Sequence, residues 1–204
     1  MSVTTILIGV TVIWSLIAFN RRELLFKQML NPYKIVQERE YYRLVTSGFI
    51  HADWGHLIFN MITLYCFGAI VEQSFNQLFS SPKLMYLVFY LSAIVVASLY
   101  DLYKYRSNSQ YNALGASGAI SAILFAAILF APTMGIYIMF IPIPIPAIIF
   151  APLYLIYCQW MARRGRDNIG HNAHFWGAVY GLLFVIMFRP SVLHSLIENL
   201  RFLN

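Results

Sequence analysis

Long apolar runs without charge, separated by short polar segments, make up most of this chain. A membrane-spanning helix needs about 20 apolar residues, within a range of about 17–25. The pattern predicts spans at residues 3–19, 55–71, 84–100, 114–131, 146–161 and 171–188. We therefore expect an all-α membrane protein in which six helices form a single domain over residues 1–204.

The segments between the predicted spans carry their own signals. Residues 20–54 are polar and rich in aromatic side chains, which predicts short helices lying at the membrane interface. Pro142, Pro144 and Pro146 alternate with isoleucines, a repeat that excludes a helix and favours an extended link before the fifth span. The first apolar run has no basic segment before it and no A-x-A cleavage site, so we interpret it as a membrane helix and not as a signal peptide.

Composition supports the same interpretation. Hydrophobic residues make up 60% of the chain and charged residues 11%, whereas a soluble domain carries about 25% charged residues. The net charge of +6 does not indicate nucleic-acid binding, because the charges lie in short segments between apolar runs. Cys66 and Cys158 both lie inside apolar runs, and no CxxC or zinc-type spacing is present, so we expect neither a disulfide framework nor a metal site.

Polar side chains at membrane depth are concentrated at the starts of the second, fourth and sixth spans. A charged group at the centre of a membrane helix costs about 2.5–3.5 kcal/mol on insertion scales, so such groups are functional candidates. With six spans, these three starts lie on the same side of the membrane, where we expect them to face one another. The candidate residues are His51, His56 and Asn60 in the first cluster, Ser117 in the second and His174 in the third. His171 lies one turn before His174, where we expect it at the interface and assign it no role.

Spacing within these clusters indicates acyl-transfer chemistry. Ser117 lies near a helix N-terminus, whose free N–H groups and dipole favour a developing negative charge. His174 shares a helix face with Gly177 and Gly181, and a Gly-x-x-x-Gly face allows one membrane helix to pack closely on another. That packing would bring His174 to Ser117, and a serine beside a histidine is the minimal constellation for a covalent acyl intermediate.

Three motifs, each at the start of an even-numbered span, resemble the rhomboid family of intramembrane serine proteases. The motifs are His51-x4-His56-x3-Asn60, Gly115-x-Ser117-Gly118 and Ala173-His174-x2-Gly177-x3-Gly181. The six-span layout is similar to the basic rhomboid core, so the resemblance covers nearly the whole chain. It implies a rhomboid-like bundle and an enzyme that cleaves transmembrane segments of membrane-protein substrates in the bilayer, without a cofactor.

The resemblance also implies roles for individual residues. Ser117 and His174 would form a catalytic dyad without an acidic third member. The oxyanion would be stabilised by His56, Asn60 and the backbone N–H of Ser117. Structural support is expected from His51, Arg43, Glu72, Gly177 and Gly181.

Two positions depart from the family pattern. Tyr42 precedes Arg43 where rhomboids typically have a tryptophan, and Ser121 stands where some members stack an aromatic ring on the histidine. The departure at Ser121 concerns the packing of His174 and leaves the dyad itself in place.

The resemblance to small bacterial rhomboids implies a multi-pass protein of the bacterial inner (plasma) membrane, with its active site facing outward. The positive-inside rule favours the opposite orientation. Most of the 14 Lys and Arg residues lie on the active-site side of the predicted topology. The other side holds Lys83, Arg189 and Arg201.

Two other functions fit parts of the pattern. Four histidines, His51, His56, His171 and His174, could converge as a zinc or iron site. We rank this below the protease, because Asp53 is the one carboxylate or thiol beside these histidines in the sequence, and Ser117 would have no role. The chain could also be an inactive rhomboid relative that binds membrane clients, although its serine and histidine are intact.

Overall fold

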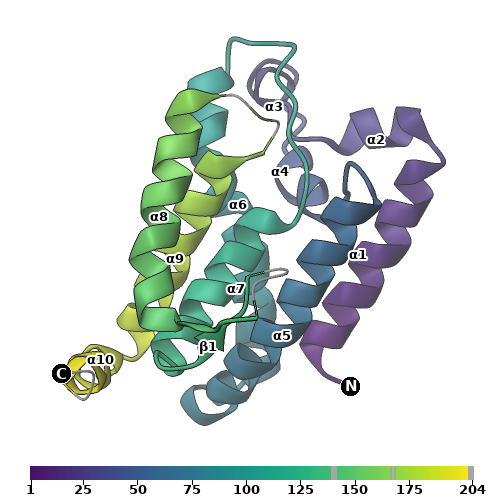
Figure 1. The fold of residues 1–204 in the computed structure, drawn as a ribbon. Helices are drawn as coiled ribbons and strands as arrows, with labels where there is room; N and C mark the ends of the chain where they lie inside the picture. The colour runs from purple at the N-terminus through teal and green to yellow at the C-terminus, as the bar shows by residue number, and fades with distance from the viewer. Residues whose placement is uncertain (139–141, 166, 168, 202–204) are drawn as a thin grey trace.

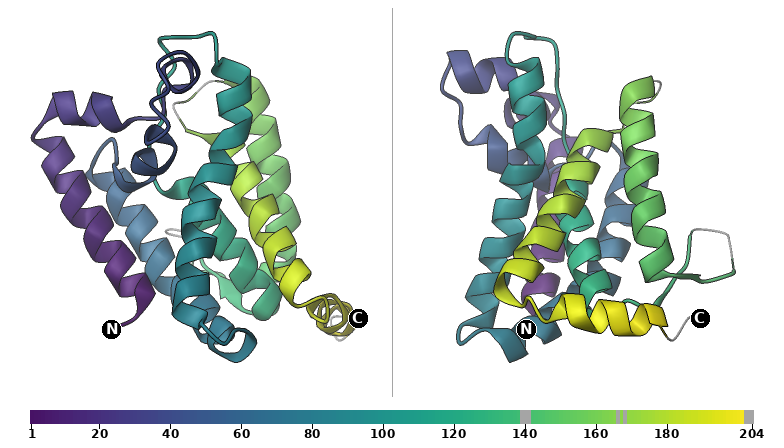
Figure 2. Two further views of the ribbon diagram at one scale, coloured as in Figure 1. Left: turned by 180° about the vertical axis from the view of Figure 1, so that it is seen from behind. Right: turned by 90° about the vertical axis from the view of Figure 1, so that its left-hand side faces the viewer.

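The computed structural model describes residues 1–138, 142–165, 167 and 169–201, and this part of the chain folds into a bundle of helices (Figure 1). The predicted spans correspond to α1 (Val3–Phe19), α5 (Trp54–Leu78), α6 (Pro82–Tyr105), α7 (Ser117–Phe130), α8 (Ala147–Arg164) and α9 (His171–Phe188). A further helix, α10 (Val192–Arg201), lies across the end of the bundle at which α1 begins (Figure 2). The protein is therefore mostly helical, as the pattern predicts.

Helix α7 forms the centre of the bundle. Residues 118–129 of this helix are all buried, and α5, α6 and α9 pack around it. The α7 sequence is uncharged and mixes alanine and glycine with larger aliphatic residues. A helix that is apolar on every side can be buried on every side, so the start of α7 is held in the middle of the fold.

The helices meet the criteria for membrane spans to different degrees. Among the described residues, α5 and α6 are long and apolar enough to cross a bilayer, and α9 with α10 would count as a third span if that bent pair is one unit. Helices α1 and α7 are apolar but shorter, with 17 and 14 residues. These apolar helices belong to an integral membrane protein. That the chain crosses the membrane six times stays a prediction.

The segment between α1 and α5 contains the short helices that its composition predicts. They are α2 (Arg22–Gln28), α3 (Pro32–Gln37), α4 (Arg43–Thr46) and the 3-10 helix η1 (Ser47–Phe49). Before α8, strands β1 (Gly135–Ile136) and β2 (Ile145–Pro146) pair antiparallel, which confirms the extended link at both of its ends. Pro142 and Pro144 lie in this link, and residues 139–141 lie outside the described part of the chain.

Two predicted helix ends are wrong. Helix α5 continues past Glu72 to Leu78, and α6 continues past Asp101 to Tyr105. Each acidic residue remains inside its helix because its carboxylate has partners from another part of the fold. The Glu72 carboxylate accepts hydrogen bonds from the backbone N–H groups of Val3 and Thr4, at 2.7 and 3.1 Å, and from the Thr4 hydroxyl at 2.7 Å.

Candidate active site

The starts of α5, α7 and α9 lie against one another in the folded chain. The backbone N–H of Ala116, just before α7, donates to His51 Nε2 at 3.4 Å. On the other side of α7, a Cβ atom placed on Gly118 would lie 3.3 Å from the carbonyl oxygen of Ala173. The structure therefore brings the three predicted polar clusters together, with Ser117 between the α5 cluster and α9.

His51 is the most deeply connected polar residue of this region. Its Nε2 accepts hydrogen bonds from the Asn60 amide at 3.0 Å and from the Ala116 N–H, both of which are donors. Nε2 must then carry the lone pair, so Nδ1 carries the proton and donates to Ser15 Oγ at 2.9 Å, and Ser15 in turn donates to the Phe49 carbonyl. Burial lowers the pKa of His51 to about 3, which agrees with this neutral form.

His56 packs against the turn that precedes Ser117. Its ring lies edge-on to the His51 ring, with 4.9 Å between the centroids. Gly115 has a φ of +117° and its N–H donates to the Ser47 carbonyl at 2.9 Å. A Cβ atom at Gly115 would lie 2.5 Å from His56 Cε1. Only glycine combines this conformation with this close approach, which explains why the position two residues before Ser117 is glycine.

Ser117 is the first residue of α7 and is partly exposed. Ala116 occupies the N-cap position and makes no side-chain capping bond. The first N–H groups of a helix have no partner within the helix, so donors lie next to the Ser117 side chain. The sequence predicted Ser117 near a helix N-terminus, three residues inside a span from residue 114, and the structure places it at the terminus itself.

Helix α9 packs on α7 through backbone contact. A Cβ atom on Gly177 would overlap the Gly118 carbonyl oxygen and lie 2.8 Å from its carbon, and one on Gly181 would meet Ala122 in the same way. The close packing that the Gly-x-x-x-Gly spacing predicts is therefore present. His174 lies one turn before Gly177, on the same helix face, at the level where α7 begins.

The proposed dyad also requires a hydrogen bond between the Ser117 hydroxyl and the His174 ring. Across the described residues, the structure records no hydrogen bond between Ser117 and the His174 ring. Catalytic hydrogen bonds are often long or misaligned without substrate, so the Ser117–His174 dyad stays a prediction that rests on the neighbouring backbones.

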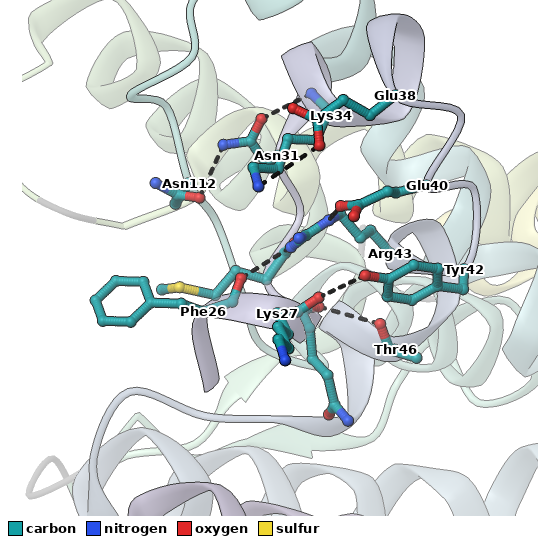
Figure 3. A network of polar contacts seen from close by, with 12 residues as sticks. Phe26, Lys27, Asn31, Lys34, Glu38, Glu40, Tyr42, Arg43, Thr46 and Asn112 are labelled. Atoms are coloured by element: carbon teal, nitrogen blue, oxygen red, sulfur yellow. Dashed lines mark hydrogen bonds and ion pairs between the residues drawn. The ribbon is translucent and has the colours of Figure 1, made fainter. Parts of the chain in front are cut away.

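Arg43 connects the short helices that lie between α1 and α5 (Figure 3). The side chain is only 2% exposed, and its Nη1 donates to the carbonyl oxygens of Phe26 and Met29 at 2.8 and 2.9 Å. Its Nε donates to the Glu40 carboxylate at 2.5 Å. Arg43 thus ties the end of α2 to the start of α4, while Glu72 binds the start of α1 at the opposite end of α5.

Two buried polar residues near the site, Asp101 and Ser121, have partners that the sequence did not indicate. Asp101 of α6 is 2% exposed, and its carboxylate accepts from Asn172 Nδ2 at 3.0 Å and from the Tyr111 hydroxyl at 2.9 Å. These bonds hold the start of α9 beside α6. The available signal was an acidic residue within an otherwise apolar and aromatic run. Ser121, which departs from the family pattern, forms a hydrogen bond of 3.0 Å with the Tyr154 hydroxyl of α8.

The four candidate histidines form two pairs, and their surroundings differ from what the sequence suggests. His51, just before α5, lies against His56 in the first turn of α5, whereas His171 and His174 lie on α9. The sequence indicated Asp53 as the one carboxylate or thiol beside these histidines. In the structure, the pair on α9 has both a thiol and a carboxylate nearby. Cys158 of α8 approaches both rings, and Asp167 lies 3.1 Å from His171 Nε2.

Comparison with known proteins agrees with the motifs. A family model described as "Rhomboid domain" matches residues 38–191, a range that contains all three motifs. RHOMBOID-like protein 12, mitochondrial, from Arabidopsis thaliana is 30% identical over 83% of this chain and 52% of its own length. RHOMBOID-like protein 4 from the same plant is 27% identical over 79% of this chain and 38% of its own length.

The chain spans about half or less of the length of these curated relatives. All are plant proteins, and two of the matching relatives carry "mitochondrial" in their names, so they lend no support to the expected bacterial inner membrane. The family model covers most of the chain, and the first relative matches over most of it as well. The chain therefore belongs to the rhomboid family.

Proposed function

We propose that this chain is an intramembrane serine endopeptidase that cleaves transmembrane segments of membrane-protein substrates with a Ser117–His174 dyad. The observation that carries the proposal is the backbone contact between Gly177 and Gly118. Each of these glycines lies within one turn of a proposed catalytic residue. Membership of the rhomboid family supports the same activity.

In the proposed reaction, the neutral His174 ring accepts the proton of Ser117 as the hydroxyl oxygen attacks the substrate carbonyl. The oxyanion forms at the start of α7, where the helix N–H groups and the His56 and Asn60 side chains supply donors. Asn60 uses one amide hydrogen on His51, and its other hydrogen is assigned to the oxyanion. His174 returns the proton to the leaving amine, and water then hydrolyses the acyl-enzyme.

Helix α8 is the proposed route by which a substrate helix enters from the lipid. Its described residues are mostly accessible, and only Ala147 and Cys158 are buried. A helix with few buried contacts opens at low cost in free energy. The loop after α8 would move with it and admit water to the acyl-enzyme.

The proposal includes six spans and an active site on the opposite side of the membrane from the N-terminus. The start of α1 lies at the end of the bundle opposite the α3 and α4 segment (Figure 1), which supports this arrangement. A reporter inserted in residues 106–112 and a tag at the N-terminus should therefore report opposite sides. If the tag and the reporter were both accessible from the same side, the proposed topology would be wrong. Fractionation of the cell's membranes then shows which membrane holds the protein.

Fluorophosphonate labelling of the detergent-solubilised protein tests the activity directly. The wild type should be labelled, and Ser117→Ala should lose the label completely. Ser121→Ala is the matched control, because Ser121 lies one turn further along α7 and bonds to Tyr154. The Ser121→Ala variant should keep the label. Absence of labelling in a folded wild type would favour the inactive, client-binding alternative.

Cleavage of a model transmembrane substrate in proteoliposomes extends the test to the reaction itself. Wild type should release both fragments, and Ser117→Ala should release none. Labelling without cleavage would show that Ser117 is reactive, and it would contradict the proposed endopeptidase activity.

A further inference from the structure

A second cluster of reactive side chains lies between α8 and α9, beside the proposed dyad. Cys158, His171 and His174 each offer one ligand atom, and these atoms all lie within 4.8 Å of one another. Cys158 and His171 are buried and His174 is partly exposed. His171 and His174 are three residues apart on α9 and so lie on one side of that helix, and Cys158 of α8 approaches both.

The two ring nitrogens of His171 lie in different environments. Nε2 lies 3.1 Å from both carboxylate oxygens of Asp167, to which it donates its proton. Nδ1 then carries a lone pair, although the side chain is only 4% exposed and Nδ1 has no hydrogen-bond partner among the described residues. Buried polar atoms almost always have a hydrogen-bond partner, so the unpaired Nδ1 of His171 is a candidate for binding a ligand.

The Asp167–His171 pair is also the arrangement that orients metal-binding histidines. A ligating histidine usually donates its second N–H to a carboxylate, which selects the tautomer and makes the ligand more basic. With Nε2 bonded to Asp167, Nδ1 is the His171 ring nitrogen left to coordinate a ligand.

We propose that Cys158, His171 and His174 bind one Zn²⁺ ion, and that bound zinc inhibits the protease by occupying His174. The site stands on the geometry above, and the inhibitory effect rests on the proposed function. A ring nitrogen that coordinates zinc has no lone pair left to accept the Ser117 proton. Zinc binding would release the thiol proton of Cys158 to solvent, so the bound ligands are one thiolate and two neutral imidazoles.

Ligand chemistry selects the metal class. Thiolate and imidazole favour Zn²⁺ and other borderline or soft ions, whereas Mg²⁺ and Ca²⁺ require oxygen ligands. Around tetrahedral zinc, with Zn–N near 2.0 Å and Zn–S near 2.3 Å, ligand atoms are about 3.3–3.6 Å apart. The cluster must therefore contract by about 1 Å, which rotation of the three side chains can supply. Three protein ligands leave the fourth position to water.

Zinc binding is measured first, in a form that needs no catalysis. The chain with Cys66→Ser and Ser117→Ala keeps Cys158 as its only cysteine, because the sequence holds two. Equilibrium dialysis should find one Zn²⁺ per chain, and Co²⁺ in its place should show thiolate-to-cobalt charge-transfer absorption. A chain that binds no zinc, or that binds Co²⁺ without the thiolate band, overturns the site. This spectroscopic readout needs no change at Cys158 and so does not depend on the folding of a ligand variant.

Ligand variants then locate the ion. Cys158→Ser and His171→Ala should each weaken zinc binding by at least about 100-fold, and Asp167→Ala, which acts through His171, by about 10–100-fold. The matched control is the exposed pair of His194 and Glu198, which has the same i, i+4 spacing with 3.2 Å between its atoms. Substituting alanine for either control residue should leave zinc affinity unchanged. Equal effects from the two pairs would overturn the assignment.

Inhibition is tested last, on the catalytic chain. Zn²⁺ should block fluorophosphonate labelling of Ser117 in the wild type, a chelator should restore it, and Cys158→Ser should shift the required zinc concentration upward by at least about 100-fold. If zinc binds without changing the labelling, the inhibitory role is wrong, whereas the assignment of the metal site stands. A chain that is never labelled, even with chelator, contradicts the proposed protease and its inhibition, while the dialysis result still decides the metal site.

Discussion

Gly177 of α9 rests directly on the carbonyl group of Gly118 in α7, so closely that a single methyl group would force the two helices apart. This contact lies one turn after His174 and one residue after Ser117. Because Gly177 has no side chain, α9 can approach α7 closely enough to bring His174 to the level of Ser117. The same principle applies at Gly181, which rests on the Ala122 carbonyl one turn further along.

Gly177→Ala should destabilise the protein and reduce cleavage together. Inserting a methyl group into a close-packed contact costs about 1–3 kcal/mol, and here it meets backbone that cannot rotate away. Thermal unfolding in detergent measures the first effect and substrate cleavage the second. Gly9→Ala in α1 is the control, because a Cβ there meets nothing within 4 Å, and alanine is a better helix former than glycine, so it should lower neither stability nor cleavage. A Gly177→Ala variant with wild-type stability would contradict the backbone contact.

Ser117→Ala and His174→Ala should each abolish cleavage, and the double variant should be no worse than either single one. Residues that act as a unit give non-additive losses, because removing one member already disables the other. Cleavage rates of the three variants, with their unfolding temperatures, give the comparison. Residual cleavage by His174→Ala above the level of Ser117→Ala would show that the serine has a different base.

Asn60→Ala should lower the cleavage rate by about 10²–10³-fold while leaving some activity, because it removes one oxyanion donor of several. Stability must be measured alongside, since the Asn60 amide also donates to His51. Ser15→Ala is the matched test of that second role, because Ser15 bonds to His51 on its far side. It should reduce stability with little loss of rate in the folded fraction. If Asn60→Ala behaves like Ser15→Ala, the oxyanion role of Asn60 is wrong.

Glu72→Ala should lower the unfolding free energy by about 1–3 kcal/mol, because it leaves the Val3 and Thr4 N–H groups without partners at the start of α1. The loss of a negative charge at a helix N-terminus adds to the effect. Glu38→Ala is the control, since that side chain is exposed and, among the described residues, forms its ion pair with Lys34 at 3.6 Å. Unfolding temperatures in one detergent measure both. Equal stability of the two variants would mean that α1 is held by its apolar contacts alone.

Much of the architecture could be predicted from the order of residues. Apolar runs of membrane length predicted the helices, and the even-numbered starts predicted where Ser117, His56 and His174 would gather. The Gly-x-x-x-Gly spacing predicted which face of α9 meets α7, because at those positions only glycine allows backbone to touch backbone. Local periodicity and the limits of backbone conformation act within a few residues, so a single sequence displays them.

Partners distant in the sequence were decided by the tertiary structure. Glu72 looked like the end of a helix, and Asp101 like part of a loop, because a sequence displays a charge and not the group that neutralises it. The carboxylate of Glu72 has its donors 68 and 69 residues away, and that of Asp101 has one 71 residues away. Cys158 and His171 likewise belong to different helices and meet only because α8 packs on α9. Hydrophobic burial along each run could be predicted from composition, whereas the pairing of buried polar groups depends on distances that exist only once the helices have packed.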